Sequence, residues 1–376
     1  MKKESFWRKP GVQTLLTSLL CILVGLLIGY LILLLIAPSG AFKAITTIIF
    51  SFMTKASSAA KMKALGNTLA KTAPLLMCAI SICFCYKVGL FNIGAAGQYE
   101  AGAGAALALA LIFKMPWYVC VIGALAAGAV LGIITGALKA YRNVNEVISG
   151  IMLNWITLYI VNMVLSNPVS KDPASPYTVD LLQGNKSAIL PSLGLGALFN
   201  NNRNVTIAIP LSIIISIVIW VVLEKTKFGY ELKATGYNKE AARYAGMHEK
   251  KNIIITLAIG GALAGLGAAF LYLSGYAKWE TTQASVPGMG FNGIAATFLG
   301  GLHPIGTIFA SFFIQNITDG GAMIDRMLYP SQISDLISGV IIYLCGFVLF
   351  FKTVMNSRKT VSKKSESSTD KKGETA

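Results

Sequence analysis

The chain has 376 residues, of which 55% are hydrophobic and 13% are charged, and its formal net charge is +16 at pH 7. A soluble domain carries about 25% charged residues, so this composition excludes an ordinary soluble protein and points to lipid as a second solvent. The basic residues stand between the apolar runs, which favours a membrane protein with basic cytoplasmic loops over a nucleic-acid-binding protein.

The apolar runs predict an all-α polytopic membrane protein of about ten transmembrane helices. In chain order the predicted spans are 12–36, 69–86, 93–113, 116–136, 147–165, 206–223, 253–273, 290–300, 305–317 and 333–351. Residues 1–351 therefore form one transmembrane domain, and the charged, Ser-rich tail 352–376 is predicted to be disordered. The eighth and ninth spans are short enough to be partly re-entrant.

The distribution of basic residues predicts the orientation of the chain. With the N-terminus in the cytoplasm, the inner segments hold most of the basic residues, and ten spans return the C-terminus to the same side. Lys43, Lys55, Lys61 and Lys63 argue the other way, because they fall in the segment 37–66, which this topology treats as polar or interfacial and places outside.

Two similar Gly-rich sequences open spans that run in opposite directions. They are Gly89-Leu-Phe-Asn-Ile-Gly94 before the third span and Gly290-Phe-Asn-Gly293 at the eighth. An inverted repeat of spans 2–5 and 7–10, a common plan in transporters, would produce this pattern. Chance clustering of glycine explains it equally well.

The segment 89–98, GLFNIGAAGQ, places three glycines at a span entrance and disfavours a regular helix there. Broken helices at membrane depth occur where they are buried in protein or line a cavity. Polar residues in these Gly-broken segments are candidates for a substrate pathway, namely Asn92, Gln98, Glu100 and Asn292. A Gly-rich turn that only lets helices pack is the alternative. The polar residues of 145–154, NEVISGIMLN, predict hydrogen bonds between helices.

The most polar internal loop is 224–251. Asn238 can cap a short helix whose first turn carries Glu240, and Gly246 would end that helix. A short helix with a small-residue face suits docking into a groove on a partner, whereas an ordinary connecting loop is the alternative. The residues singled out for docking are Asn238, Glu240, Ala241, Ala242, Arg243, Tyr244 and Gly246.

The sequence contains none of the motifs that an enzyme of this size would need. It has no G-x-x-x-x-G-K-[ST], no H-E-x-x-H, no G-x-S-x-G and no paired cysteine site, so no metal or cofactor is expected. An ion-coupled secondary transporter predicts ionisable residues in mid-span, and a membrane enzyme or scaffold predicts clustered His, Asp or Glu at one face; the sequence offers little of either. The G-x-x-x-G spacings at 128, 132 and 136 and at 261 and 265 indicate close helix packing.

Four motifs, GLFNIGAAGQ, NEVISGIMLN, ATGYNKEAARYAGM and GMGFNGIAATFLGGLHPIGT, follow one another within residues 60–350. In these motifs the chain resembles the permease subunits of bacterial ABC importers, and within them the nucleoside branch served by a lipoprotein of the basic membrane protein type. A permease for a simple sugar is the alternative within the same class.

The resemblance implies a plasma-membrane importer of several chains. Two permeases, identical or related, form the pathway for a nucleoside; an extracellular substrate-binding lipoprotein delivers it, and a separate cytoplasmic ABC ATPase docks at 238–246. Such permeases usually carry a carboxylate where this chain has Ala96. Glu100 lies four residues further on, on the same face of a helix, and is expected to take over that role.

Overall fold

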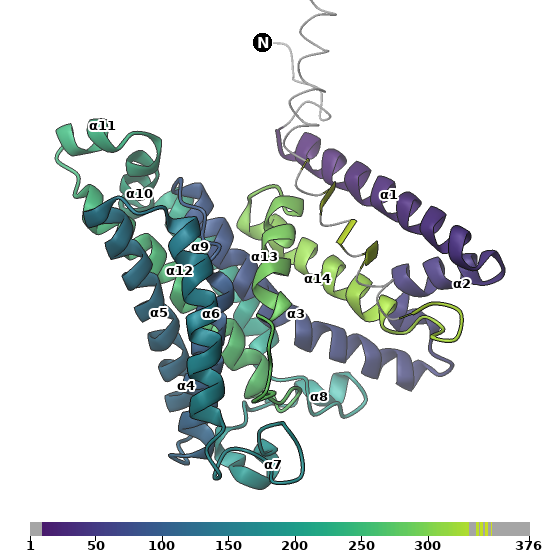
Figure 1. The fold of residues 1–376 in the computed structure, drawn as a ribbon. Helices are drawn as coiled ribbons and strands as arrows, with labels where there is room; N and C mark the ends of the chain where they lie inside the picture. The colour runs from purple at the N-terminus through teal and green to yellow at the C-terminus, as the bar shows by residue number, and fades with distance from the viewer. Residues whose placement is uncertain (1–9, 331–335, 338, 341–342, 345–346, 348–376) are drawn as a thin grey trace, which may run out of the picture.

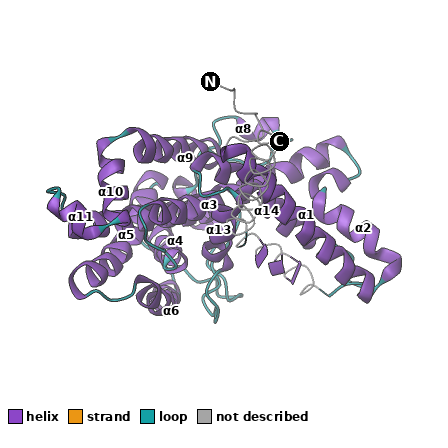
Figure 2. Cartoon of the chain, turned by 90° about the horizontal axis from the view of Figure 1, so that it is seen from above, coloured by secondary structure: helices purple, strands orange, loops and turns teal. Residues whose placement is uncertain are grey.

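The computed structural model describes residues 10–330 together with 336, 337, 339, 340, 343, 344 and 347. All regular elements of this part are helices, and the only β-type pairs in it are the isolated bridges Lys171–Thr178 and Tyr177–Glu280 (Figure 2). The predicted tenth span, 333–351, lies largely outside the described residues, as does the predicted tail 352–376.

The helices follow one another with short connections. Their bounds are α1 (Pro10–Ile36), α2 (Pro38–Ile49), η2 (Ser51–Thr54), α3 (Ser58–Lys87), α4 (Ala95–Leu111), α5 (Trp117–Arg142), α6 (Glu146–Leu165), α7 (Leu181–Gly184), η3 (Lys186–Ala188), α8 (Leu195–Leu198), α9 (Ala208–Lys225), α10 (Lys227–Tyr237), α11 (Lys239–Tyr244), α12 (Glu249–Tyr272), α13 (Gly288–Leu299) and α14 (Pro304–Gly321).

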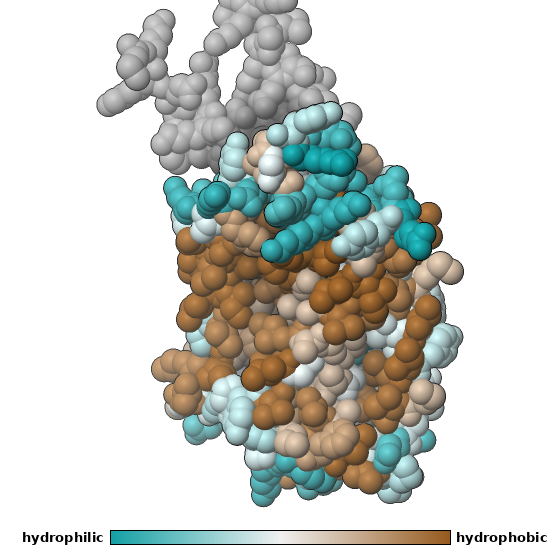
Figure 3. Space-filling view, turned by 90° about the vertical axis from the view of Figure 1, so that its left-hand side faces the viewer, coloured by the Kyte–Doolittle hydropathy of each residue, from teal (hydrophilic) through white to brown (hydrophobic). Residues whose placement is uncertain are grey.

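Among the residues that the structure describes, five helices are long and apolar enough to cross a membrane, namely α3, α5, α6, α9 and α12. In the most apolar stretch of each helix, 89% of the residues are buried in α3 and 72% in α12. The corresponding shares are 33% in α5, 33% in α6 and 28% in α9. The first two therefore form the centre of the protein, and the other three turn apolar side chains outward. Figure 3 shows the result as an apolar band between two polar ends, which is the surface expected of a polytopic membrane protein.

The predicted spans from 12–36 to 305–317 each coincide with a helix, but the segment 37–66 is more structured than its sequence suggested. It contains α2, which buries Ala41, Ala44, Ile45 and Ile48, and it contains the start of α3. The α3 helix begins at Ser58 because the Ser57 side chain accepts a hydrogen bond from the Ala60 amide at 3.2 Å. The sequence predicted a polar or interfacial stretch here and did not predict these helices.

The closest helix pair is α5 on α12. Gly128, Gly132 and Gly136 of α5 lie directly on the α12 backbone, so that a Cβ atom on Gly132 would overlap the carbonyl oxygen of Leu257. Gly128 and Gly261 exclude a side chain from one another in the same way. The close packing predicted from the G-x-x-x-G spacings is confirmed, and it fixes the two helices at backbone-to-backbone distance.

The two ends of the helices differ in what they carry. The α10 and α11 helices stand together at one end, called the α11 end, and α7 and α8 stand at the opposite end, called the α7 end (Figure 1). At the α7 end the loop after α6 is tied to the loop after α12, because the Thr178 amide donates to the Trp279 carbonyl at 2.8 Å. The fully buried Trp279 also donates its Nε1–H to Asn162 Oδ1 of α6 at 2.9 Å.

Candidate functional site

The chain is non-helical between α3 and α4, at residues 88–94, which we call the α3–α4 break. The amides of Val88 and Gly89 donate to the carbonyls of Cys85 and Tyr86, both at 3.0 Å, and Gly89 has a φ of +78° that favours glycine. The helix resumes at Ala95. The prediction of a broken helix is confirmed for 89–94 and is wrong for 95–98, which form the first turn of α4.

Two of the predicted pathway residues meet at the α3–α4 break, Asn92 within it and Gln98 in the first turn of α4. Asn92 Nδ2 donates to Gln98 Oε1 at 2.8 Å, and Gln98 Nε2 donates back to Asn92 Oδ1 at 3.2 Å. Asn92 Nδ2 also donates to Ser81 Oγ of α3 at 3.1 Å. Both amides are buried, so the reciprocal pair satisfies polar groups that would otherwise be costly in the apolar interior.

A side chain from α6 holds the α3–α4 break from the other side. Asn154 Oδ1 accepts from the Gly97 amide at 2.8 Å, and Asn154 Nδ2 donates to the Ile93 carbonyl at 3.2 Å. The amide thus serves one orphan donor of the first α4 turn and one carbonyl of the break. This confirms the prediction of bonds between helices for Asn154, whereas Asn145 and Ser149 bond within α6 and its cap.

The second Gly-rich segment lies against the first. A Cβ atom on Gly290, in the first turn of α13, would stand 2.5 Å from the Cα atom of Ala96 in the first turn of α4. The two helix starts are therefore packed backbone against backbone, and Asn292, two residues beyond Gly290, is half-buried. Since Ala96 is 1% exposed, a longer side chain at this position would have to displace α13.

Glu100 lies one helical turn beyond Ala96 and is fully buried, yet neither carboxylate oxygen has a hydrogen-bond partner in the described part of the chain. Its surroundings follow from the parallel packing of α4 on α6, in which Gly97 contacts Asn154 and Gly104 contacts Val161. Glu100 makes no hydrogen bond with the Asn92–Gln98 pair, since neither of its oxygens has a partner in the described part of the chain.

The α11 helix is a capped, exposed element at the α11 end of the molecule. Asn238 Oδ1 accepts from the Ala241 amide at 3.0 Å, which confirms the predicted cap. The helix ends at Tyr244, and Gly246 follows with a φ of +80°. Of the residues singled out for docking, Ala242 is buried and the others are exposed, namely Asn238, Glu240, Ala241, Arg243, Tyr244 and Gly246.

A groove of about 480 Å³ runs beside α11. Its wall combines Arg243 and Met247 with Tyr141 at the end of α5 and with the charged start of α12. Tyr237, the last residue of α10, and Tyr244, the last residue of α11, are 90% and 91% exposed. A capped helix, two exposed aromatic rings and an adjoining groove make this a surface suited to another protein.

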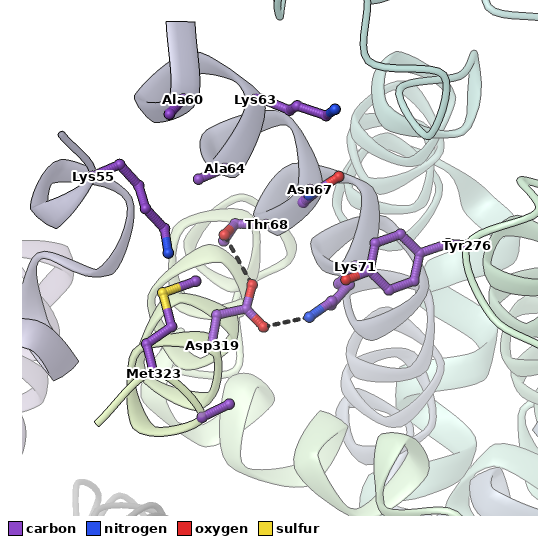
Figure 4. Close-up of a pocket in the computed structure, with 11 residues that line it drawn as sticks. Lys55, Ala60, Lys63, Ala64, Asn67, Thr68, Lys71, Tyr276, Asp319 and Met323 are labelled. Carbon is purple, nitrogen blue, oxygen red and sulfur yellow. Dashed lines mark hydrogen bonds and ion pairs between the residues drawn. The ribbon is translucent and has the colours of Figure 1, made fainter. Parts of the chain in front are cut away.

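A pocket of about 330 Å³ opens between the start of α3, the end of α14 and the loop after α12, and we call it the lysine pocket (Figure 4). Thr68 and Lys71 of α3 converge on Asp319 of α14, with contacts of 2.9 Å to Oδ2 and 2.7 Å to Oδ1. Gln315 Nε2 also donates to Asp319 Oδ1 at 2.9 Å. Lys55 reaches into the pocket from the segment before α3 (Figure 4).

We expect Asp319→Asn to destabilise the protein, because it leaves the Lys71 ammonium without its carboxylate. Asp319 is 6% exposed and Lys71 is 26% exposed, so we expect a loss of about 1–3 kcal/mol in the free energy of unfolding rather than the larger cost of a fully buried pair. The melting temperature of the detergent-solubilised chain measures it. The control is Glu231→Gln, in a surface pair with Lys227, and equal shifts in the two variants would contradict the prediction.

The sequence did not single out Asp319 or Tyr276 as site residues. Asp319 falls just beyond the predicted ninth span, although α14 continues to Gly321, and Tyr276 lies in a loop beneath Lys71, whose Nζ is 5.1 Å from its ring centroid. One signal was present, since Gln315 and Asp319 are spaced i, i+4 on one helix face.

Comparison with known proteins places the chain among transport proteins. Residues 64–346 match the family described as "Branched-chain amino acid transport system / permease component". The chain is 32% identical to the nucleoside ABC transporter permease protein NupB of Lactococcus lactis over 85% of this chain and 88% of that protein. It is 31% identical to the guanosine ABC transporter permease protein NupP of Bacillus subtilis over 92% and 97%.

A more distant relative has another printed cargo. The glucose ABC transporter permease protein TsgB13 of Haloferax volcanii is 27% identical over 77% of this chain and 77% of that protein. No solved structure matches the chain.

Proposed function

Because this chain belongs to the family of permease components of the branched-chain amino acid transport system, we propose that it carries nucleosides as the permease subunit of an ABC importer. The similarity to nucleoside and guanosine permeases along most of each chain supports this cargo. The structural observation that carries the proposal is α11, a capped and exposed helix at one polar end of an apolar helix bundle.

The importer would contain three further chains. A cytoplasmic ABC ATPase would dock on α11 and its adjoining groove, with Asn238, Glu240, Ala241, Ala242, Arg243, Tyr244 and Gly246 forming the docking element. An extracellular substrate-binding lipoprotein would deliver the nucleoside to the α7 end. A second permease, identical or related, would complete the pathway. The absence of a phosphate-binding loop from this sequence agrees with an ATPase on another chain.

Uptake of labelled nucleosides tests the cargo directly. In bacteria that lack this chain we expect uptake of labelled purine and pyrimidine nucleosides to fall and to return when the chain is restored, while uptake of ribose and glucose is unchanged. If uptake of ribose or glucose falls instead, the cargo is a sugar, as the name of the glucose relative indicates, and not a nucleoside. A tagged chain that transports without an ATP-binding partner would contradict the importer.

The full chain would cross the membrane about ten times, with spans 2–5 and 7–10 related as an inverted repeat. The described helices support the repeat, because each half packs into the other. In such a repeat α3 corresponds to α12 and α4 corresponds to α13. Thr297 Oγ1 of α13 donates to the Ala79 carbonyl of α3 at 2.7 Å, and Gly102 of α4 lies on Gly265 of α12 in the counterpart contact.

The α11 end would face the cytoplasm of a bacterial cell, and both termini would lie on that side of the plasma membrane. Lys139 and Arg142 at the end of α5 and the basic residues of α10 and α11 support this orientation. The lysine pocket then opens to the outside. Its Lys55 and Lys63 account for two of the four lysines that argued against the orientation, because they line a pocket and do not merely flank a span.

Asn92, Gln98, Glu100 and Asn292 would line the route of the solute. In the described arrangement Asn92 and Gln98 are closed on one another, so they reach solute only when the α3–α4 break opens. Glu100 would supply the carboxylate that such permeases usually carry at the position of Ala96, where the α13 backbone leaves no room for it. Its two unpartnered oxygens are free to accept hydrogen bonds from solute hydroxyl or amino groups.

We expect Glu100→Ala to lower nucleoside uptake by about 10-fold to 100-fold, as loss of one charged hydrogen bond would. The measurement is initial uptake rate at equal amounts of assembled complex. Ser311→Ala is the control, since it also removes a buried polar atom without a described partner, and we expect it to leave uptake unchanged. Normal transport by Glu100→Ala in an assembled complex would remove Glu100 from the pathway.

A further inference from the structure

The α10 helix rests directly on the α3–α4 break. A Cβ atom on Gly236, in the last turn of α10, would overlap the carbonyl oxygen of Val88 and stand 3.1 Å from the Gly89 amide nitrogen. From the other side, a Cβ atom on Gly89 would stand 2.9 Å from the Gly236 carbonyl oxygen. Two backbones without side chains between them therefore touch, and neither can move toward the other.

Charged groups join the same two elements. The Glu224 carboxylate, at the end of α9, lies 3.1 Å from Lys233 Nζ of α10 and 3.8 Å from Lys87 Nζ at the end of α3. Leu232 of α10 and Val88 of the break are buried in one hydrophobic cluster. The α10 helix is thus held to the end of α3 by backbone contact, by a shared carboxylate and by apolar burial.

The same end of α10 is joined to α11 by a single residue. Asn238 is the single residue between the two helices, and it caps both of them. Its amide donates to the Ala234 carbonyl of α10 at 3.1 Å, while its Oδ1 accepts from the Ala241 amide of α11 at 3.0 Å. A displacement of α11 therefore has to move the last turn of α10, where Gly236 lies.

The two Gly-rich segments, 89–98 and 290–293, meet at the α3–α4 break on which α10 rests. This break is closed by the Asn92–Gln98 pair, it is bonded to Asn154 of α6, and the α4 turn that follows it carries Ala96, on which Gly290 of α13 is packed. Contacts therefore run without a gap from the exposed α11 surface to the polar residues assigned to the solute route.

We propose that Gly236 is a positioning residue that transmits the movement of α11 to the α3–α4 break, so that a docked ATPase opens the Asn92–Gln98 pair. This inference rests on the proposed function. The inference adds to that function the place where docking of the ATPase is converted into opening of the Asn92–Gln98 pair. This place is the backbone contact of Gly236 with Val88 and Gly89. Any side chain at 236 separates the two elements and leaves the docking surface of α11 intact.

The test compares Gly236→Ala with the original chain in the complete complex of permeases, ATPase and lipoprotein, reconstituted in liposomes. Uptake of labelled adenosine and uridine and hydrolysis of ATP are measured on the same samples. We expect ATP hydrolysis and ATPase retention to stay unchanged, while the ratio of nucleoside transported to ATP hydrolysed falls by about 2-fold to 30-fold. A chain that merely lost stability would lower both activities together and keep the ratio.

Gly229→Ala is the matched control on the same helix. Its Cβ atom would overlap the Val222 carbonyl oxygen of α9, so it is as crowded as Gly236 but does not touch the break. We expect its ratio to equal that of the original chain. An unchanged ratio in Gly236→Ala, or an equal fall in Gly229→Ala, would overturn the proposal.

If Gly236→Ala does not accumulate in membranes, Glu224→Lys takes its place, because it sets a positive charge between Lys87 and Lys233 and drives α10 away from α3. We expect the same fall in the ratio, and an unchanged ratio overturns the proposal. Failure of the original complex to take up nucleosides would instead contradict the proposed function.

Discussion

Alanine at both Tyr237 and Tyr244 is expected to release the ATPase from the purified complex. The two rings are 90% and 91% exposed at the polar α11 end, where Tyr237 is the last residue of α10 and Tyr244 the last residue of α11. Exposed tyrosines that become buried against a partner commonly contribute 2 kcal/mol or more each. We therefore expect retention of the ATPase to weaken by at least about 30-fold.

The amount of ATPase that co-purifies with the tagged chain measures this effect, and nucleoside uptake is expected to fall in proportion. Tyr159→Ala is the control, since this ring is 60% exposed but lies on α6, along the apolar flank of the bundle. Undiminished retention of the ATPase by the double variant would show that α11 is not the docking element.

The second large effect is expected from Gly132→Ala in α5. The added methyl group overlaps the Leu257 carbonyl and crowds the Ala258 backbone, and neither can yield as a side chain does. The α5 and α12 helices must therefore separate along their backbone contact. We expect a destabilisation at the upper end of the range of about 1–3 kcal/mol for overpacking.

The amount of chain in membranes and its melting temperature in detergent measure the loss. Gly123→Ala in the same helix is the control, because its Cβ atom meets only the end of the flexible Leu109 side chain, which can rotate away. Equal melting temperatures for the two variants would show that backbone contact between α5 and α12 does not set the stability.

The sequence predicted which faces of helices pack closely but not which helices they meet. The G-x-x-x-G spacings marked Gly128, Gly132 and Gly261 correctly, since a small-residue stripe is a local property of one helix. Their mutual contact depends on how α12 lies in the finished bundle. Likewise Lys71 and Asp319 are 248 residues apart, and no local pattern connects them.

The polar loop 224–251 shows a second reason why some structural features could be predicted from the sequence and others could not. Its cap at Asn238 was predictable, because capping depends on neighbouring residues. The helix α10 was missed, since its sequence lacks an apolar stripe and it is held instead by Thr226, which caps it, and by Asn252, which donates to Thr235 Oγ1 at 2.8 Å. For the same reason the Asn92–Gln98 pair could be named as polar residues in a break but not as partners of one another.

The glycine contact between α5 and α12 has a consequence for how the protein is made. Synthesis proceeds from the N-terminus, so α5 enters the membrane well before α12, which begins only at Glu249. Until then its glycine stripe exposes backbone that lipid tails pack poorly. The early half of the chain is therefore an incompletely packed intermediate. Insertion of α12 then covers the glycine stripe of α5 and completes this contact of the bundle.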